Sequence, residues 1–128
     1  MRRGVTGAPS GENYLNHIGT VHAAAQLALA EACSGEFLLR SLRQFPALQQ
    51  LSEGTIIPVV RRVESKFRKP ANGRIIGKLN PQTSIEESLT ELPSKGRCLL
   101  TIHIDIFDEH VQHTLMASFD WFIAIQNQ

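Results

Sequence analysis

The sequence predicts an α+β domain in which one long central helix is wrapped by a curved antiparallel sheet. Two patterns carry this prediction: residues 22–42 have helical periodicity, and four strand-like segments follow, joined mostly by tight turns. Strands joined by hairpins pair antiparallel, and one helix can cover one face of such a sheet. With 128 residues the chain is large enough for one core and too small for two, so we expect a single domain over residues 1–128.

The helix is the first element after a glycine-containing beginning. Residues 1–12 contain three glycines and a proline and are expected to be a flexible leader, and residues 13–21 could hold a short strand and a turn. The helix is rich in Ala, Leu, Gln and Glu, and its first half is apolar nearly all round, which predicts burial on most sides. Gly35 interrupts the helix at a cost of about 1 kcal/mol relative to Ala, and we interpret it as a point of close packing.

The remaining segments read as strands and connections. Residues 70–73 (Pro-Ala-Asn-Gly) form a strong turn signal, which predicts a hairpin around residues 60–74, whereas residues 82–95 look polar and irregular with at most one helical turn. Residues 97–107 alternate cleanly between apolar and polar side chains, as a strand with one buried face does. We expect strands over residues 55–67, 74–79, 97–107 and 111–126.

Charge and cysteine content exclude several classes of protein. The 13 Lys and Arg residues nearly balance the 12 Asp and Glu residues, which gives no overall electrostatic case for nucleic acid or an anionic membrane as a partner. No apolar run follows the basic N-terminus before residue 14, and the uncharged stretch 13–30 is too polar to span a membrane. Cys33 and Cys98 fit buried, reduced thiols. We therefore expect a cytoplasmic protein.

The strongest functional signal lies where a polar turn leads into the helix. No residue from 13 to 30 is charged, so Glu31 is a carboxylate in an apolar helix, which is costly unless it has a partner or a function. The turn before the helix would aim free backbone N–H groups at whatever lies ahead of it. Together these features suggest an acyl-transfer or hydrolysis site.

These residues carry a family likeness. The run Asn16-x-x-Gly19-Thr20-x-His22-Ala23, then Glu31, then Phe67-Arg68-Lys69-Pro70-Ala71-x-Gly73, resembles hotdog-fold acyl-CoA thioesterases, most closely the phenylacetate-pathway type and its uncharacterised relatives. The likeness covers residues 13–126. It implies the hotdog fold, an acyl-CoA substrate, a homodimer or homotetramer with its active site at a dimer interface, and no cofactor other than the coenzyme A of the substrate.

The resemblance also assigns roles residue by residue. The Ala23 backbone N–H would stabilise the oxyanion, Glu31 would act as general base or nucleophile, and Asn16 would position substrate or water. Substrate contacts at the same junction would come from Gly19, Thr20 and His22. The sequence departs from the commonest pattern in having Ala23-Ala24 where a Gly-Gly pair is usual, and Glu31 where Asp is frequent.

Helix geometry supports a shared site. Nine helical residues rise about 13.5 Å, so Glu31 cannot easily reach a carbonyl held at the start of its own helix. A second copy of the chain could bring another helix N-terminus to it. The sequence therefore predicts that Glu31 of one subunit meets Ala23 of the other.

Other readings stay open. Glu31 could pair with an Arg or accept hydrogen bonds in the core, Asn16 could be only a turn residue, and His22 is better explained as a hydrogen bonder at the helix start. A non-catalytic hotdog module that binds acyl chains or scaffolds a partner is the first alternative function. A hotdog dehydratase acting on 3-hydroxyacyl thioesters is the second.

Two further polar groups have a functional and a structural interpretation. Six basic residues surround the expected hairpin; most should be solvated, and Arg68, Lys69 and Arg74 are the candidates for contact with coenzyme A phosphates. The second group consists of histidine and aspartate residues near the last two expected strands. A polar sheet face explains this group better than a metal site, so no metal is expected. The basic group is Arg61, Arg62, Lys66, Arg68, Lys69 and Arg74; the other is His103, Asp105, Asp108, His110 and His113.

Overall fold

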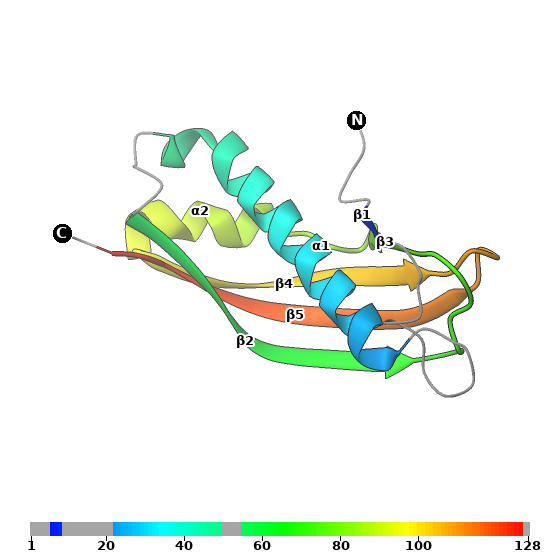
Figure 1. Cartoon of the computed structure of the whole chain (residues 1–128). Helices are drawn as coiled ribbons and strands as arrows, with labels where there is room; N and C mark the ends of the chain where they lie inside the picture. Colours follow the sequence, from blue (N-terminus) through cyan, green and yellow to red (C-terminus); the bar gives the residue numbers. More distant parts are fainter. Residues whose placement is uncertain (1–5, 9–21, 50–54, 127–128) are drawn as a thin grey trace.

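The computed structural model describes residues 6–8, 22–49 and 55–126. In these ranges a long helix lies over one face of an antiparallel sheet, with a shorter second helix beside it (Figure 1). The α+β prediction is confirmed. The elements in chain order are β1 (Thr6–Ala8), α1 (Ala23–Gln44), the 3₁₀ turn η2 (Pro46–Leu48), β2 (Ile56–Phe67), β3 (Ile75–Leu79), α2 (Glu86–Lys95), β4 (Arg97–Phe107) and β5 (His113–Ile125).

The sheet has five strands in the order β1-β3-β4-β5-β2, and every neighbouring pair is antiparallel. Helix α1 packs on β1, β3, β4 and β5, and α2 packs mainly on β4. Strand β2 is therefore an edge strand of the described sheet that α1 leaves largely uncovered. Within the described ranges, no helix is both long enough and apolar enough to span a lipid bilayer.

The alternation predicted for the last two strands is confirmed and builds the core. Leu100, Ile102, Ile104 and Ile106 of β4 are all buried on the face toward α1. Phe119, Trp121 and Ile123 of β5 lie on the same face, because each is paired in register with a buried residue of β4. Fully burying a large apolar side chain stabilises a fold by roughly 1.5–3 kcal/mol, so this face holds the domain together. The helix contributes Leu29, Ala30, Cys33, Leu38 and Leu42.

The predicted hairpin around residues 60–74 is wrong. Strand β2 pairs with β5 from Ile56 opposite Ile125 to Phe67 opposite Leu115, whereas β3 pairs with β1 and β4. The turn signal at residues 70–73 does mark a turn, with Gly73 at φ +75°, but the chain there crosses to the far side of the sheet. A turn motif determines the local backbone conformation, but it does not determine which strands pair with each other. The long β5 also offers β2 far more hydrogen-bonded pairs than the short β3 could.

Two other expectations fail. Residues Thr6–Ala8, within the expected flexible leader, form β1 and pair with residues Ile75–Gly77 of β3. Residues Glu86–Lys95, expected to be irregular, form the ten-residue helix α2, whose Leu89 and Leu92 are buried. The sequence did not indicate this helix because Pro93 lies in its last turn and many of its residues are polar. The helix ends at Gly96, which has the left-handed conformation that favours glycine.

Candidate active site

Three of the predicted site residues lie on or directly before α1, and three cannot be placed. Glu31 is in the middle of the helix, Ala23 is its first residue, and His22 is the residue that precedes it; all three are exposed. Asn16, Gly19 and Thr20 lie outside the described residues. The geometry below therefore concerns the helix and the sheet face beside it.

The first backbone N–H groups of α1 have no hydrogen-bond acceptor among the described residues. The N–H groups of Ala25 and Gln26 donate to the His22 carbonyl at 3.1 and 3.2 Å. Those of Ala23 and Ala24 have no acceptor among the described residues, and His22 makes no side-chain capping bond to them. The first turn also lacks an acidic residue. A helix N-terminus with free N–H groups and the positive end of the helix dipole is suited to hold a developing oxyanion.

Burial on most sides, which the apolar first half of the helix predicts, is wrong for the single chain. One side of this half is buried, through Gln26, Leu29, Ala30 and Cys33, while Glu31 lies on an exposed side. Small residues surround it there, namely Ala24, Ala28 and Ala32. Within the described part of the chain, the Glu31 carboxylate has neither a hydrogen-bond partner nor an ion-pair partner, so an internal salt bridge does not explain it.

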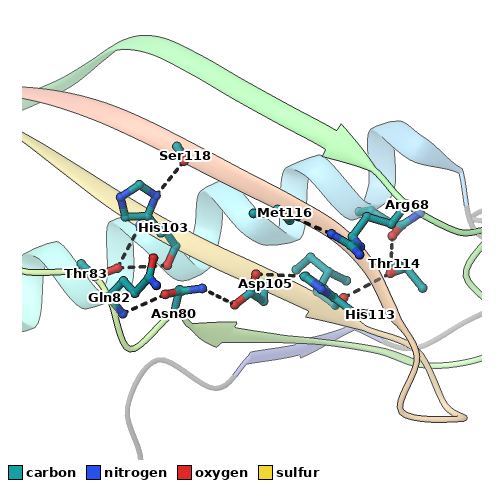
Figure 2. Close-up of polar contacts among 12 residues, drawn as sticks. Arg68, Asn80, Gln82, Thr83, His103, Asp105, His113, Thr114, Met116 and Ser118 are labelled. Atoms are coloured by element: carbon teal, nitrogen blue, oxygen red, sulfur yellow. Dashed lines mark hydrogen bonds and ion pairs between the residues drawn. The ribbon is translucent and has the colours of Figure 1, made fainter.

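The sheet beside this exposed side of α1 also presents apolar side chains. Val63 pairs in register with Phe119 and Phe67 with Leu115, so both point to the same face as the core. They are nevertheless 43% and 46% exposed, because α1 does not extend over β2. Figures 1 and 2 both show the N-terminal end of α1 beside the end of β2. The N-terminal part of α1, whose Glu31 has no partner among the described residues, thus lies beside uncovered apolar residues of β2.

The basic residues separate into two groups. Arg61 lies 3.9 Å over the Phe122 ring and Arg62 pairs with Glu64 at 3.2 Å. Arg68 lies just past the end of β2, where its Nη1 is 3.7 Å from the Met116 sulfur (Figure 2). The backbone N–H groups of Arg68 and Lys69 both donate to the Thr114 carbonyl, at 2.8 and 3.4 Å. Arg68 and Lys69 are therefore at the same end of the molecule as the start of α1.

Arg74 is also exposed, on the connection that leads to β3. The Arg68–Arg74 segment passes the β4–β5 turn, where the Asn72 N–H donates to the Asp108 carboxylate at 3.1 Å. The three cations predicted to meet coenzyme A phosphates thus share one connection, although it is not the expected hairpin.

The histidine and aspartate residues of the last two strands form a polar outer sheet face. His103 Nδ1 is 2.7 Å from the Ser118 hydroxyl, and Asp105 accepts from Asn80 at 2.9 Å and lies 2.9 Å from His113 Nε2 (Figure 2). Among the described residues, no group of three or more His, Cys, Asp or Glu side chains is arranged to hold a metal ion.

Asp108 is a structural carboxylate at the turn between β4 and β5. Its burial raises the pKa, but backbone N–H groups of Gln112, Asn72 and His110 donate to it, and together they hold the pKa below the ordinary value of 3.8. The carboxylate therefore ties the connection before β3 to this turn.

Sequence reasoning did not single out Trp121 and Gly35 as neighbours. Trp121 lies on the inward face of β5, and a β-carbon placed on Gly35 would lie 3.7 Å from the edge of its ring. This is ordinary contact, so Gly35 does not mark the close packing read from the sequence. The alternation placed Trp121 on the correct face, but the pairing with α1 depends on how the helix crosses the sheet, which one sequence does not give.

Comparison with solved structures identifies the fold. A protein of Pseudomonas aeruginosa, PA5026, described as a probable thioesterase, matches with a TM-score of 0.71 and 21% identity over 95% of this chain and 76% of that one. OLEI01261 of Chlorobaculum tepidum, of unknown function, matches with a TM-score of 0.72 and 18% identity over 96% and 76%. A hypothetical thioesterase of Streptococcus pneumoniae, solved with coenzyme A, matches with a TM-score of 0.62 and 17% identity over 100% and 84%.

The neighbours are hotdog-fold proteins, so the chain has the hotdog fold, and the resemblance found in the sequence is confirmed at the level of fold. The chain belongs to the family described as Domain of unknown function (DUF4442), whose model matches residues 3–123. No curated protein matches the chain.

Proposed function

We propose that this protein is a thioesterase that hydrolyses acyl-CoA to the free acid and coenzyme A. One observation carries the proposal: Glu31, a carboxylate with no partner among the described residues, stands exposed on a helix of small apolar residues whose N-terminal end lies beside the uncovered strand β2. A solvated salt-bridge network would explain an exposed glutamate more simply, but no such partner exists among the described residues. Structural neighbours described as a probable and a hypothetical thioesterase, the second solved with coenzyme A, support the same reading.

The proposed enzyme is a homodimer that closes this surface. Glu31 lies about 12 Å along the axis from Ala23 of its own helix, at 1.5 Å per residue, so one chain cannot present both to one carbonyl. In a two-fold dimer the contact is reciprocal, and each Glu31 would meet Ala23 of the partner subunit. Such a dimer would also cover Val63 and Phe67, whose exposure in the single chain is otherwise unfavourable.

The chemistry follows from these positions. Glu31 takes a proton from a water molecule whose oxygen bonds to the thioester carbonyl carbon, and the N–H of Ala23 of the partner subunit donates to the oxyanion. The carbon–sulfur bond then breaks, its electron pair goes to sulfur, and the proton completes the thiol of coenzyme A. Alternatively, the Glu31 oxygen attacks the carbonyl carbon directly, the carbon–sulfur bond breaks, and the thiolate of coenzyme A leaves behind an anhydride. Water then hydrolyses the anhydride to the free acid, which restores Glu31 and supplies the proton that completes the thiol.

The remaining predicted residues complete the proposal. Asn16 would position the carbonyl or the water, and Gly19, Thr20 and His22 would shape the junction around the thioester. Arg68, Lys69 and Arg74 would pair with the phosphates of coenzyme A, for which Arg and Lys are well suited. No other cofactor enters this chemistry.

Thiol release from a panel of short, medium, long and aromatic acyl-CoAs tests the proposal. Glu31→Ala should fold normally and lose nearly all turnover, because the carboxylate makes no contact that stabilises the described fold. Glu36→Ala is the matched control: it removes another exposed glutamate of α1, one that pairs with Arg40 at 2.9 Å. Its turnover should stay at the wild-type level. Equal activity in Glu31→Ala and wild type would refute the assignment, and binding of acyl-CoA without turnover by the wild type would favour a non-catalytic module.

A further inference from the structure

The connection between β2 and β3, residues 68–74, carries the three exposed cations Arg68, Lys69 and Arg74. None of them forms an ion pair with a carboxylate in the part of the chain that the structure describes. Arg and Lys side chains are long and rich in rotamers, so a site built from them is preorganised only if the backbone beneath them is fixed. The contacts that fix residues 68–74 therefore decide how well these cations can meet an anionic group.

The backbone of this connection is held at its start, in its middle and near its end. At the start, two N–H groups donate to the Thr114 carbonyl of β5. In the middle, the Ala71 side chain is fully buried in the core. Near the end, both sides of Asn72 are held: its N–H donates to Asp108 Oδ2 at 3.1 Å, and its carbonyl accepts from the Glu109 N–H at 3.2 Å. The last of these attachments depends on the β4–β5 turn, which belongs to another part of the sequence.

The two carboxylate oxygens of Asp108 have separate tasks. Oδ1 accepts from the N–H groups of His110 and Gln112, at 2.9 and 3.0 Å, and so holds the β4–β5 turn. Oδ2 accepts from the Asn72 N–H and so holds the connection. Asp108 is only 3% exposed and forms no ion pair with a cation among the described residues. It therefore fixes the connection without pairing with the cations that the connection carries.

We propose that Asp108 is a positioning residue for the substrate: through the Asn72 N–H it holds residues 68–74 in the conformation in which Arg68, Lys69 and Arg74 meet the phosphates of coenzyme A together. This inference rests on the proposed function, which assigns those phosphates to the three cations. It deepens that function, because it makes one buried carboxylate responsible for selecting thioesters of coenzyme A over thioesters of the pantetheine arm alone, which has no phosphates.

The variant Asp108→Asn separates positioning from a plain effect of charge. An amide has one oxygen and one NH₂ group, so it cannot accept both from the turn and from Asn72. When its oxygen serves the turn, its NH₂ group faces another donor at Asn72, and the connection is released. Loss of a negative charge near a cationic site would by Coulomb attraction alone strengthen the binding of an anion. Weaker binding in this variant therefore reports lost position.

Binding of coenzyme A by isothermal titration calorimetry tests the inference without any need for turnover. We expect the Kd to rise about tenfold from wild type to Asp108→Asn, because a charged site has lost its preorganisation. Thr101→Val is the matched control, since it removes a side-chain hydrogen bond from the outer sheet face, where no cation of the connection lies. Its Kd should equal that of wild type.

Kinetics with two substrates gives a readout that a merely structural role would not move. The acyl group that the wild type hydrolyses best is supplied on coenzyme A and on pantetheine. In Asp108→Asn the KM for the acyl-CoA should rise by the same factor as the Kd, while its kcat and the kcat/KM for the acyl-pantetheine stay at the wild-type level.

A second variant keeps the inference testable if Asp108→Asn does not fold. Gly73→Ala acts on the same connection and leaves the carboxylate untouched. Gly73 has φ +75°, which is unfavourable for alanine, and a β-carbon there would overlap the Glu109 side chain, so the connection must shift. We expect the same selective rise in the Kd of coenzyme A. A folded Gly73→Ala protein that binds coenzyme A as wild type does would contradict the inference.

The outcomes separate this inference from the proposed function. Equal losses on both substrates, or unchanged or tighter binding of coenzyme A by Asp108→Asn, would overturn the role of Asp108 and leave the thioesterase proposal intact. A selective loss of coenzyme A binding in a protein whose wild type hydrolyses no thioester would support the role of Asp108 and refute the proposed function. A wild type that does not bind coenzyme A at all would overturn both.

Discussion

The Thr114 hydroxyl donates to the side-chain oxygen of Gln26 at 2.7 Å, and both residues are buried. This bond joins the start of β5 to the first turns of α1. The same hydroxyl lies 3.3 Å from the Ile106 carbonyl, so the contact ties three elements together. It fixes the helix end at which the proposed oxyanion donors lie.

Thr114→Val should therefore destabilise the protein. Valine has nearly the same shape but leaves the buried Gln26 oxygen without its donor, at roughly 1–3 kcal/mol. Urea unfolding of wild type and variant measures this change as a lower midpoint. Thr101→Val is the control: Thr101 bonds Asp120 at 2.6 Å on the partly exposed outer face, where water can replace it, so the loss should be smaller. Equal losses would argue against a special role for the buried pair.

Gly77→Ala should also destabilise the fold, for a steric reason. A β-carbon on Gly77 would overlap the Cys33 sulfur and lie 3.2 Å from Ile106 Cδ1. Cys33 is fully buried, so the helix must move away from β3, and overpacking of this kind typically costs 1–3 kcal/mol. Cys33→Ala combined with Gly77→Ala should recover part of the loss in thermal unfolding. A single variant as stable as wild type would show that α1 and β3 are not held this close.

Asp108 should make stability depend on acidity. Its pKa is lower in the folded protein than the ordinary 3.8, so the stability it contributes is fully present above that value and is lost as the pH falls toward the folded-state pKa. Asp108→Asn should lower the free energy of unfolding near neutral pH and flatten its fall in acid. Unfolding at a series of pH values measures both effects. A variant with the same steep acid dependence as wild type would assign that dependence to other carboxylates.

Val63→Lys should break the proposed oligomer without unfolding the chain. Val63 is 43% exposed in the single chain, so lysine can be solvated there, but the proposed dimer would bury it. Light scattering after gel filtration should show a monomer, and turnover should fall with it. Val111→Lys, at a 77% exposed position of the β4–β5 turn, should change neither. A Val63→Lys protein of unchanged mass and activity would exclude this face as the interface.

The sequence predicted those parts of the fold that depend on local periodicity. Alternation placed Ile102 and Ile104 inward and His103 outward, since a strand with one buried face must have that pattern. It could not give the partner of β2, because strand pairing depends on contacts far apart in the chain, such as that between Asn72 and Asp108.

The candidate site shows the same division. The exposed position of Glu31, and an Ala23 N–H that has no acceptor among the described residues, follow from where the helix begins and which side it buries. The neighbourhood of Trp121 and Gly35 does not, since it depends on the crossing of α1 over β5. Helix periodicity alone also could not tell which apolar side of α1 is buried within the chain and which is exposed.

The most direct test of a site shared between subunits is complementation between two inactive variants. Ala23→Pro removes the proposed oxyanion donor, and proline is well tolerated at the first position of a helix; His22, at φ −55° and ψ 142°, already has a conformation that can precede proline. Alone, this variant should lose about 10²-fold or more in turnover, as loss of an oxyanion donor does elsewhere.

Ala23→Pro and Glu31→Ala subunits are then co-expressed with different tags, and thiol release by the mixed population is measured. Each mixed dimer contains one site in which both groups are intact, so random mixing should restore about a quarter of wild-type turnover. Turnover no higher than that of the separate variants, in a population shown to contain mixed dimers, would contradict a site built from Glu31 of one subunit and Ala23 of the partner subunit.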